Sequence, residues 1–239
     1  MTKYFYLVGM LVSALLLSAC STPIIKLQHV TQPQAKLAAF GDVDVQVFTD
    51  NRPAALREPE DRITYQEVLK SDNLMSEFLQ TSQGVGSSTW YYATDPQVSV
   101  FLHNIMQQVG VQSGFSNSHA TKHYVLQGVI HNLSLKWTQT QGVVVVNVKF
   151  TGILRKKNGV MLMIIPIDFN YTQAMTKPLA DKEQTMLLNA LMDQALTASV
   201  EQMYKMIWIN FPAPAPSPAL RAKRPLPRRG EVKKPVSKL

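Results

Sequence analysis

Residues 144–171 read VVVNVKFTGILRKKNGVMLMIIPIDFNY, and this stretch decides the fold. From residue 144 to residue 154 apolar side chains alternate with polar ones, which predicts a strand with one buried and one solvated face. Asn158-Gly159 is the pair that a type I′ turn favours, so the chain should double back into a second strand, Met161 to Tyr171. Pro166 cannot donate to the ladder, so this second strand should form a sheet edge or contain a bulge.

Two further strands are predicted upstream. Residues 123–137 are rich in β-formers, and Gly128 interrupts their alternation where a bulge would fit. The turn at 139–142 then leads into the strand at 144. Residues 43–48 also alternate, with Val43, Val45 and Val47 on one side, and Pro53 ends that ladder.

Two amphipathic helices are predicted beside these strands. Thr94-Asp95-Pro96 should cap and begin the first, whose apolar stripe runs from residue 98 to residue 109 before Gly110 ends it. The second has a wide apolar stripe over 187–207. Its methionines could line an adaptable groove, but packing of one face on the sheet also explains them. The resulting order, β-α-β-β-β-α, is that of an α+β two-layer sandwich, an antiparallel sheet with both helices on one face.

The start of the chain has the organisation of a signal peptide. Lys3 is followed by a short apolar segment that ends in Leu17-Ser18-Ala19-Cys20, which holds the only cysteine of the chain and looks like a bacterial lipobox. The alternative, a transmembrane or buried helix, needs about 20 apolar residues, and this run is shorter. Cys20 is therefore expected to carry a thioether-linked diacylglycerol and an amide-linked acyl chain such as palmitate, enough for stable anchoring. No other cofactor is expected.

Ser21 follows the lipid-bearing cysteine. By resemblance to enterobacterial lipoproteins, where aspartate at this position retains the protein in the inner membrane, this favours the periplasmic face of the outer membrane. The chain then divides into a signal peptide (1–19), a lipidated cysteine and tether (20–40), an α+β periplasmic domain (41–211) and a proline-rich basic tail (212–239). The cysteine-free domain suits an oxidising compartment.

The positive charge of the chain is concentrated in the tail. Of 24 basic and 16 acidic residues, eight basic residues and one acidic residue lie in 212–239, and Lys3 lies in the signal peptide, so residues 20–211 carry 15 of each sign. A neutral domain behind an export signal excludes nucleic acid as a partner. The residues of the tail that could contact an anionic surface are Arg221, Lys223, Arg224, Arg228, Arg229, Lys233, Lys234 and Lys238.

Several short motifs accompany this arrangement. They are the lipobox, the first strand running into Asp50-Asn51-Arg52, the Thr94-Asp95 helix start, Ile130-His131-Asn132-Leu133, the Asn158-Gly159 hairpin and the long closing helix. Together, over residues 40–208, they resemble the YajG-like family of outer-membrane lipoproteins and, more distantly, the auxiliary lipoproteins of ABC-type envelope transporters. The resemblance implies a fold and a location but no enzymatic activity.

No group of residues in the sequence predicts catalysis or a metal site. His119 and His123 have a helical ligand spacing but lie at the entry to a strand without a nearby carboxylate. Asp50 and Arg52 could form an exposed recognition pair, although a local pair that closes the loop is favoured. Residues 54–89 show only short pieces of helical spacing, in Tyr65, Val68 and Leu69 and then in residues 74–79, followed by a glycine-rich break at 84–88.

The sequence therefore leaves two non-enzymatic functions. The domain is expected to be an accessory or structural subunit of an envelope transport or secretion complex. Alternatively, it is an envelope-binding module whose basic tail contacts peptidoglycan or anionic lipid.

Overall fold

A computed structural model describes residues 23–37, 40, 43–69, 86–116, 123–175 and 184–211. The elements in chain order are β1 (Ile24–Lys26), β2 (Val43–Val45), β3 (Thr49–Asp50), the 3-10 turn η2 (Ala54–Leu56), β4 (Arg62–Leu69), β5 (Gly86–Asp95), α3 (Val98–Gln112), β6 (Tyr124–Thr138), β7 (Val143–Lys156), β8 (Met161–Ala174) and α4 (Gln184–Asn210). The lipobox and the basic tail lie outside the described residues.

The strands form one mixed sheet in the order β1-β5-β4-β6-β7-β8, with β2 and β3 also pairing with β6. The meander β6-β7-β8 is antiparallel, as the hairpin signals predict, and β8 with its exposed Pro166 is an edge strand. The expectation of an entirely antiparallel sheet is wrong, because β1 runs parallel to β5 and β2, β3 and β4 run parallel to β6. The chain reaches these parallel neighbours through long connections rather than hairpins.

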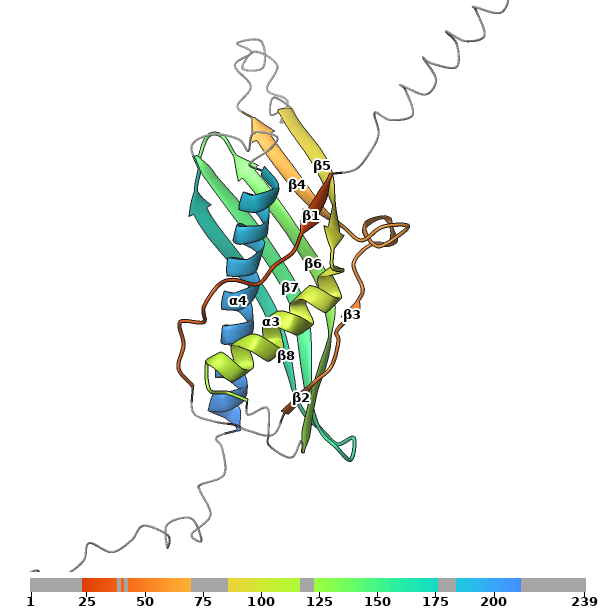
Figure 1. Cartoon of the computed structure of the whole chain (residues 1–239), viewed down its shortest axis with the longest axis vertical. Coiled ribbons are helices and arrows are strands. Elements are labelled where there is room, and N and C mark those ends of the chain that lie inside the picture. Colours follow the sequence, from red (N-terminus) through yellow and green to blue (C-terminus); the bar gives the residue numbers. More distant parts are fainter. Residues whose placement is uncertain are drawn as a thin grey trace, which may run out of the picture.

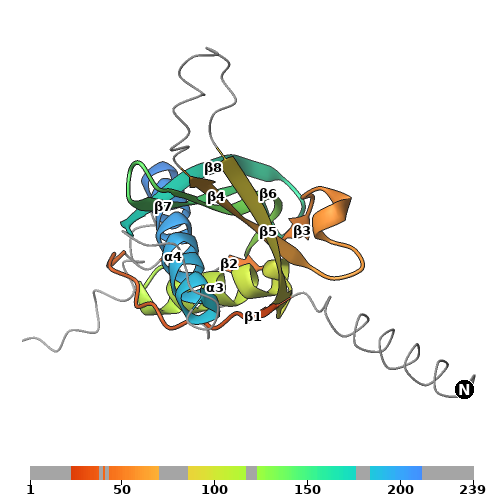
Figure 2. The same ribbon diagram turned by 90° about the horizontal axis from the view of Figure 1, so that it is seen from above.

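Both helices cover the same face of the sheet, which we call the helix face (Figures 1 and 2). The core between the sheet and the helices includes the apolar stripe of α4 and four residues of β7, Val144, Val146, Val148 and Phe150. On the opposite side, which we call the outer face, the described residues form no helix. This confirms the α+β two-layer architecture.

The first helix begins and ends later than its sequence signals indicate. Thr94 and Asp95 still belong to β5, so the cap of α3 is Gln97, and the amide of Val98 donates instead to the distant carboxylate of Asp61, at 2.6 Å. Gly110 does not end the helix. It is a buried contact with α4, since a Cβ there would lie 3.4 Å from the Tyr204 hydroxyl.

Gly128 is needed for a close approach rather than for a bulge. A Cβ at this position would lie 2.2 Å from the Thr151 carbonyl oxygen and 2.3 Å from a ring carbon of Phe48. The register shift of β6 occurs instead between Ile130 and Asn132. Phe48 fills the space above Gly128 and is buried, whereas Val47 is exposed, so the predicted alternation of residues 43–48 fails at its end.

The segment 54–89 contains strands rather than the predicted helical pieces. Tyr65 and Val68 lie in β4. Residues 86–88, part of the predicted flexible break, lie in β5 and pair with β4. The second piece, residues 74–79, is outside the described residues.

The predicted tether is part of the domain. β1 pairs with β5, and both Ile25 and Leu27 are buried in the core. Residues 27–37, which we call the strap, then cross the helices on the side that points away from the sheet (Figures 1 and 2). At its end the strap binds the C-terminal end of α3, where Lys36 Nζ donates to the Gln112 carbonyl at 3.0 Å and the Leu37 amide to the Ser113 carbonyl at 2.8 Å.

Candidate functional site

Most of the site residues predicted from the sequence fall outside the described residues: Leu17, Ser18, Ala19 and Cys20, the eight basic residues of the tail, and His119. His123 is exposed and directly precedes β6. Within the described ranges no three His, Cys, Asp or Glu side chains lie close enough together to hold a metal ion. Neither α3 nor α4 is apolar over a length that could cross a bilayer.

The strap is held on α4 by a ladder of polar side chains with helical spacing. Asn189, Asp193 and Glu201 stand four and eight residues apart along the helix and all face the strap. Asn189 accepts from the Gln28 amide at 2.9 Å, and Glu201 accepts from the Gln34 amide at 2.5 Å. This side of α4, which would otherwise be solvated, thus binds a second segment of the chain.

Asp193 is the central contact of this ladder. It is completely buried and accepts four hydrogen bonds, from His29 Nδ1 (2.5 Å), the amides of Val30 (2.9 Å) and Thr31 (2.8 Å), and the Thr31 hydroxyl (2.6 Å). Burial acts to raise the pKa of Asp193, but the bonds from His29, Thr31 and Val30 outweigh it and hold the pKa below its usual value. The carboxylate therefore stays ionised and fixes the strap.

A second buried charge connects the strands to the start of α3. Arg52 is only 1% exposed and donates to both Asp50 and Asp61, and its Nη1 donates to the Arg62 carbonyl at 2.8 Å. Burial acts to lower the pKa of Arg52, but the two carboxylates outweigh it and raise the pKa. The favoured local pair at Asp50 is confirmed, and the exposed recognition pair is wrong. Because Asp61 also caps α3, this network is structural.

The outer face of the sheet carries a row of polar side chains that crosses four strands. In register, Asn170 of β8 pairs with Asn147 of β7, Asn147 with Ser134 of β6, and Ser134 with Thr64 of β4. We call this set the polar row. Paired residues of neighbouring strands point to the same face, so all four side chains line one side.

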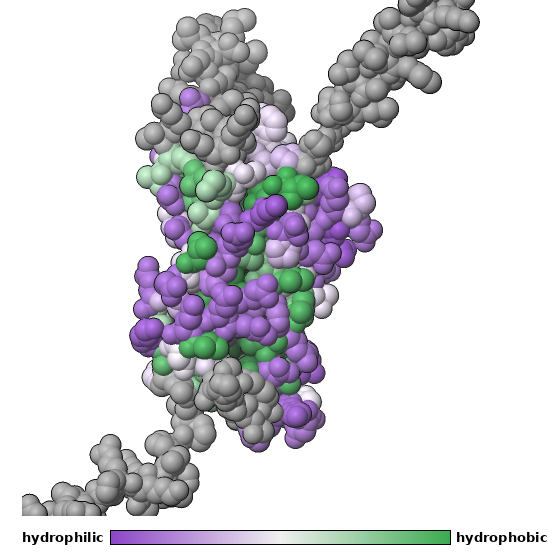
Figure 3. Space-filling view, in the orientation of Figure 1, coloured by the Kyte–Doolittle hydropathy of each residue, from purple (hydrophilic) through white to green (hydrophobic). Residues whose placement is uncertain are grey.

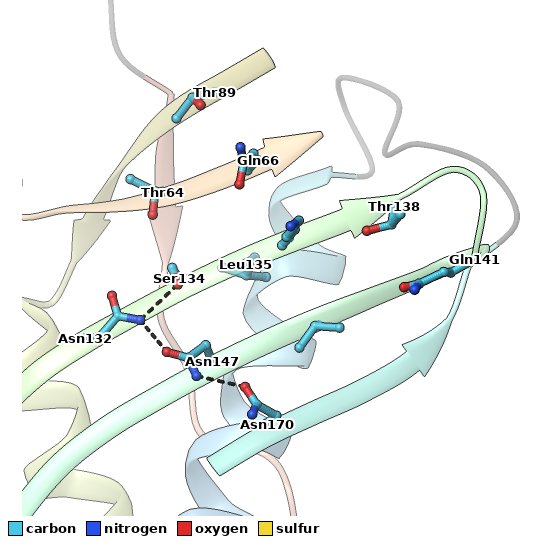
Figure 4. A pocket seen from close by; sticks show the side chains of 12 residues that line it. Thr64, Gln66, Thr89, Asn132, Ser134, Leu135, Thr138, Gln141, Asn147 and Asn170 are labelled. Atoms are coloured by element: carbon cyan, nitrogen blue, oxygen red, sulfur yellow. Dashed lines mark hydrogen bonds between the residues drawn. The ribbon is translucent and has the colours of Figure 1, made fainter. Parts of the chain in front are cut away.

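Hydrogen bonds join the amides at one end of the polar row. Asn132 Nδ2 donates to Ser134 Oγ at 3.0 Å and to Asn147 Oδ1 at 2.5 Å, and Asn147 Nδ2 donates to Asn170 Oδ1 at 2.7 Å (Figure 4). Asn132 uses both of its N–H groups in these bonds, but each side-chain amide has two N–H groups, so Asn147 keeps one unused donor and Asn170 keeps two among the described residues.

A groove of about 580 Å³ lies along this row. Its lining is almost entirely uncharged: Thr64, Gln66, Thr89, Asn132, Ser134, Leu135, Lys136, Thr138, Gln141, Val145, Asn147 and Asn170. Lys136 is the one charged residue in that lining. An opposite charge pair, Lys149 to Asp168 at 2.9 Å, lies beside the row. The groove can hydrogen-bond a polar, uncharged surface, and it contains no arrangement of acid, base and nucleophile.

Comparisons with known proteins leave the family open. No family model matches the chain, and the search of curated proteins gives no match. Among solved structures the chain is similar to protein XCC0632 of Xanthomonas campestris, described by the family model DUF330, with a TM-score of 0.48 and 13% identity over 78% of this chain and 95% of that one. It is also similar to a putative lipoprotein of Caulobacter crescentus (TM-score 0.35, 10% identity, 49% of this chain and 86% of that one) and to lipoprotein GNA1162 of Neisseria meningitidis (TM-score 0.24, 13% identity, 66% of this chain and 97% of that one).

Proposed function

We propose that this protein is a lipoprotein of the periplasmic face of the outer membrane, lipidated on Cys20, and a non-catalytic accessory subunit of an envelope transport or secretion complex. The observation that carries the proposal is the position of Leu17-Ser18-Ala19-Cys20, four residues ahead of a strand that belongs to the sheet. A signal of this kind directly before a folded domain is what a lipid-anchored protein requires.

The outer face of the sheet supports the accessory role. Neither α3 nor α4 covers it, and it carries the polar row, whose unused donors and acceptors can bind a polar protein surface. A transporter or secretion subunit docked there would leave the helix face, with its strap, toward solvent. Hydrophilic side chains dominate that helix face, and its apolar patches are separate (Figure 3).

Acyl labelling tests the anchor. Wild-type protein should incorporate labelled fatty acid, whereas Cys20→Ala should remain an unlabelled, unprocessed precursor. Normal processing of Cys20→Ala, together with absence of label in the wild type, would overturn the lipoprotein proposal.

Site-specific photo-crosslinking tests the partner. A crosslinking amino acid at Asn147, in the polar row, should capture an envelope protein in intact cells, and the same amino acid at Gln202, exposed on α4, is the matched control. An adduct at position 147 and none at position 202 supports the docking face. If a lipidated protein gives no adduct at 147, or equal adducts at both positions, the outer face is not where a partner binds.

The charge of the tail favours a second candidate, an envelope-binding module. The tail follows α4, whose last residue, Asn210, is 21 residues, or about 30 Å along the helix, beyond Asn189, where Gln28 of the strap binds. We therefore favour peptidoglycan over the anchoring membrane as the contact of residues 212–239. Truncation after Phe211 should preserve lipidation and the melting temperature but weaken binding to isolated sacculi at low salt, and equal binding by both proteins would contradict this candidate.

A further inference from the structure

The distance between the proposed lipid anchor and the domain is short. Only Ser21, Thr22 and Pro23 separate Cys20 from Ile24, the first residue of β1. Four residue steps span at most about 14 Å even when fully extended. A tether running to residue 40 would allow several times that distance. The β1 end of the domain must therefore stay close to the bilayer that holds the acyl chains.

The strap holds the N-terminal segment that contains β1 on the domain. Ile25 and Leu27 are fixed in the core, and the next residues are bound to the ladder of α4 through Asn189 and Asp193. The anchor is thus attached to a rigid position on the molecule rather than to a flexible arm, and one particular side of the domain faces the membrane.

That side carries large exposed apolar side chains. Ile24 is 59% exposed, Trp90 51% and Tyr91 49%. Ile24 pairs with Ala93, and Tyr91 lies two residues before Ala93 on the same strand, so Ile24 and Tyr91 share a face, while Trp90 projects from the other side of the β5 edge. Trp and Tyr are the side chains that favour the interface between water and lipid, because each combines an apolar body with a polar group.

The charges around this edge nearly cancel. Lys26 pairs in register with Asp95, and Arg62 lies 3.5 Å from Glu60. Attraction to anionic headgroups therefore contributes little, and contact with lipid depends on the aliphatic and aromatic side chains.

We infer that the edge formed by β1 and β5, through Ile24, Trp90 and Tyr91, lies in the headgroup region of the leaflet into which the acyl chains of Cys20 insert. This inference rests on the proposed lipidation. The headgroup region is only about 5–8 Å thick on each side of the hydrocarbon core, so an anchor at most 14 Å long places these side chains in or beside it. The lipid and the protein edge then bind the membrane together and set the orientation of the domain.

Tryptophan quenching by lipid tests this placement. Full-length lipidated protein is reconstituted into vesicles of phosphatidylethanolamine and phosphatidylglycerol that contain brominated lipid, and flotation with the vesicles confirms that the anchor is inserted. Of the three tryptophans, Trp137 is buried in the core, and Trp208 lies near the far end of α4, about 30 Å from the strap contact at Asn189. Trp208→Phe is therefore the matched control for Trp90→Phe.

Brominated lipid should quench the wild type and Trp208→Phe alike, and most of this quenching should be lost in Trp90→Phe. It should change little with salt. If the protein floats but Trp90→Phe is quenched like the wild type, the edge does not touch lipid, although the lipoprotein proposal stands. Quenching lost only in Trp208→Phe would show the opposite orientation. A protein that carries no acyl chain and does not float would overturn the proposed function itself.

Discussion

Replacing Asp193 with alanine tests whether the strap is an integral part of the domain. The change removes the acceptor of four hydrogen bonds and leaves the ring N–H of His29 and the amides of Val30 and Thr31 without their partner. Removal of one member of a buried charged network costs about 3–5 kcal/mol. The strap lies at the surface and can detach, which limits the loss, so we expect a value near the lower end of that range.

Asp168→Ala is the matched control, because Asp168 is 61% exposed and pairs with Lys149 on the outer face. An exposed pair contributes about 0–1 kcal/mol. Chemical denaturation of a chain without residues 1–20, followed by circular dichroism at neutral pH, measures both variants. If Asp193→Ala unfolds at the same denaturant concentration as Asp168→Ala, the strap does not stabilise the domain and the proposed anchor is not held close to it.

The difference in stability between the wild type and Asp193→Ala should depend on pH. Because the pKa of Asp193 is lowered in the folded protein, its contribution is complete above the pKa of an unfolded aspartate, about 4, and is lost as the pH falls through the folded value. The stability difference between wild type and Asp193→Ala should therefore be constant at neutral pH and shrink below about pH 4. A difference that stays constant into strong acid would contradict the assigned role of the carboxylate.

Three further substitutions, two of them with a matched control variant, test the rest of the fold by the same denaturation assay. Gly128→Ala should cost about 1–3 kcal/mol, because its Cβ overlaps a backbone oxygen and an aromatic ring, whereas Gly159→Ala, at φ +90° in open space, should cost about 1 kcal/mol. Leu191→Asp, which buries a charge between α4 and the sheet, should cost several kcal/mol, and Gln202→Asp on the exposed side of the same helix should cost almost nothing. Arg52→Met should cost about 3–5 kcal/mol by leaving two carboxylates unpaired, and a variant as stable as the wild type would show that the network is dispensable.

The meander could be predicted from the sequence because its pairing is local. In the structure the loop Lys157-Asn158-Gly159 joins β7 to β8, and the Lys156 amide donates to the Val160 carbonyl at 2.8 Å across it. A register shift between Leu154 and Arg155 then restores the pairing of Asn147 with Asn170 that a two-residue turn would give. The turn at 139–142 places Ser134 opposite Asn147 in the same way. Part of the polar row was therefore present in the sequence, and only the register had to be followed to find it.

The N-terminal segment could not be predicted in this way. Its two prolines and its polar residues are typical of a linker, although Ile25, Leu27 and Phe40 are buried in the core. What orders it is a set of partners on α4, and a carboxylate on a helix gives no local signal of which distant amide it will bind. The parallel pairs of β1 and β4 are hidden for the same reason, since their neighbours in the sheet are not their neighbours along the chain.

The strap also determines the order in which the domain can be completed. Its hydrogen-bond partners on α4 lie 161–167 residues further along the chain. A chain that crosses a membrane from its N-terminus exposes the strap long before α4 has followed. Lipid attachment and signal cleavage at Cys20 would then act on an open, accessible segment. In the proposed lipoprotein the strap could bind α4 only after nearly the whole domain had been exported, so its closure over that helix would be a late step of folding.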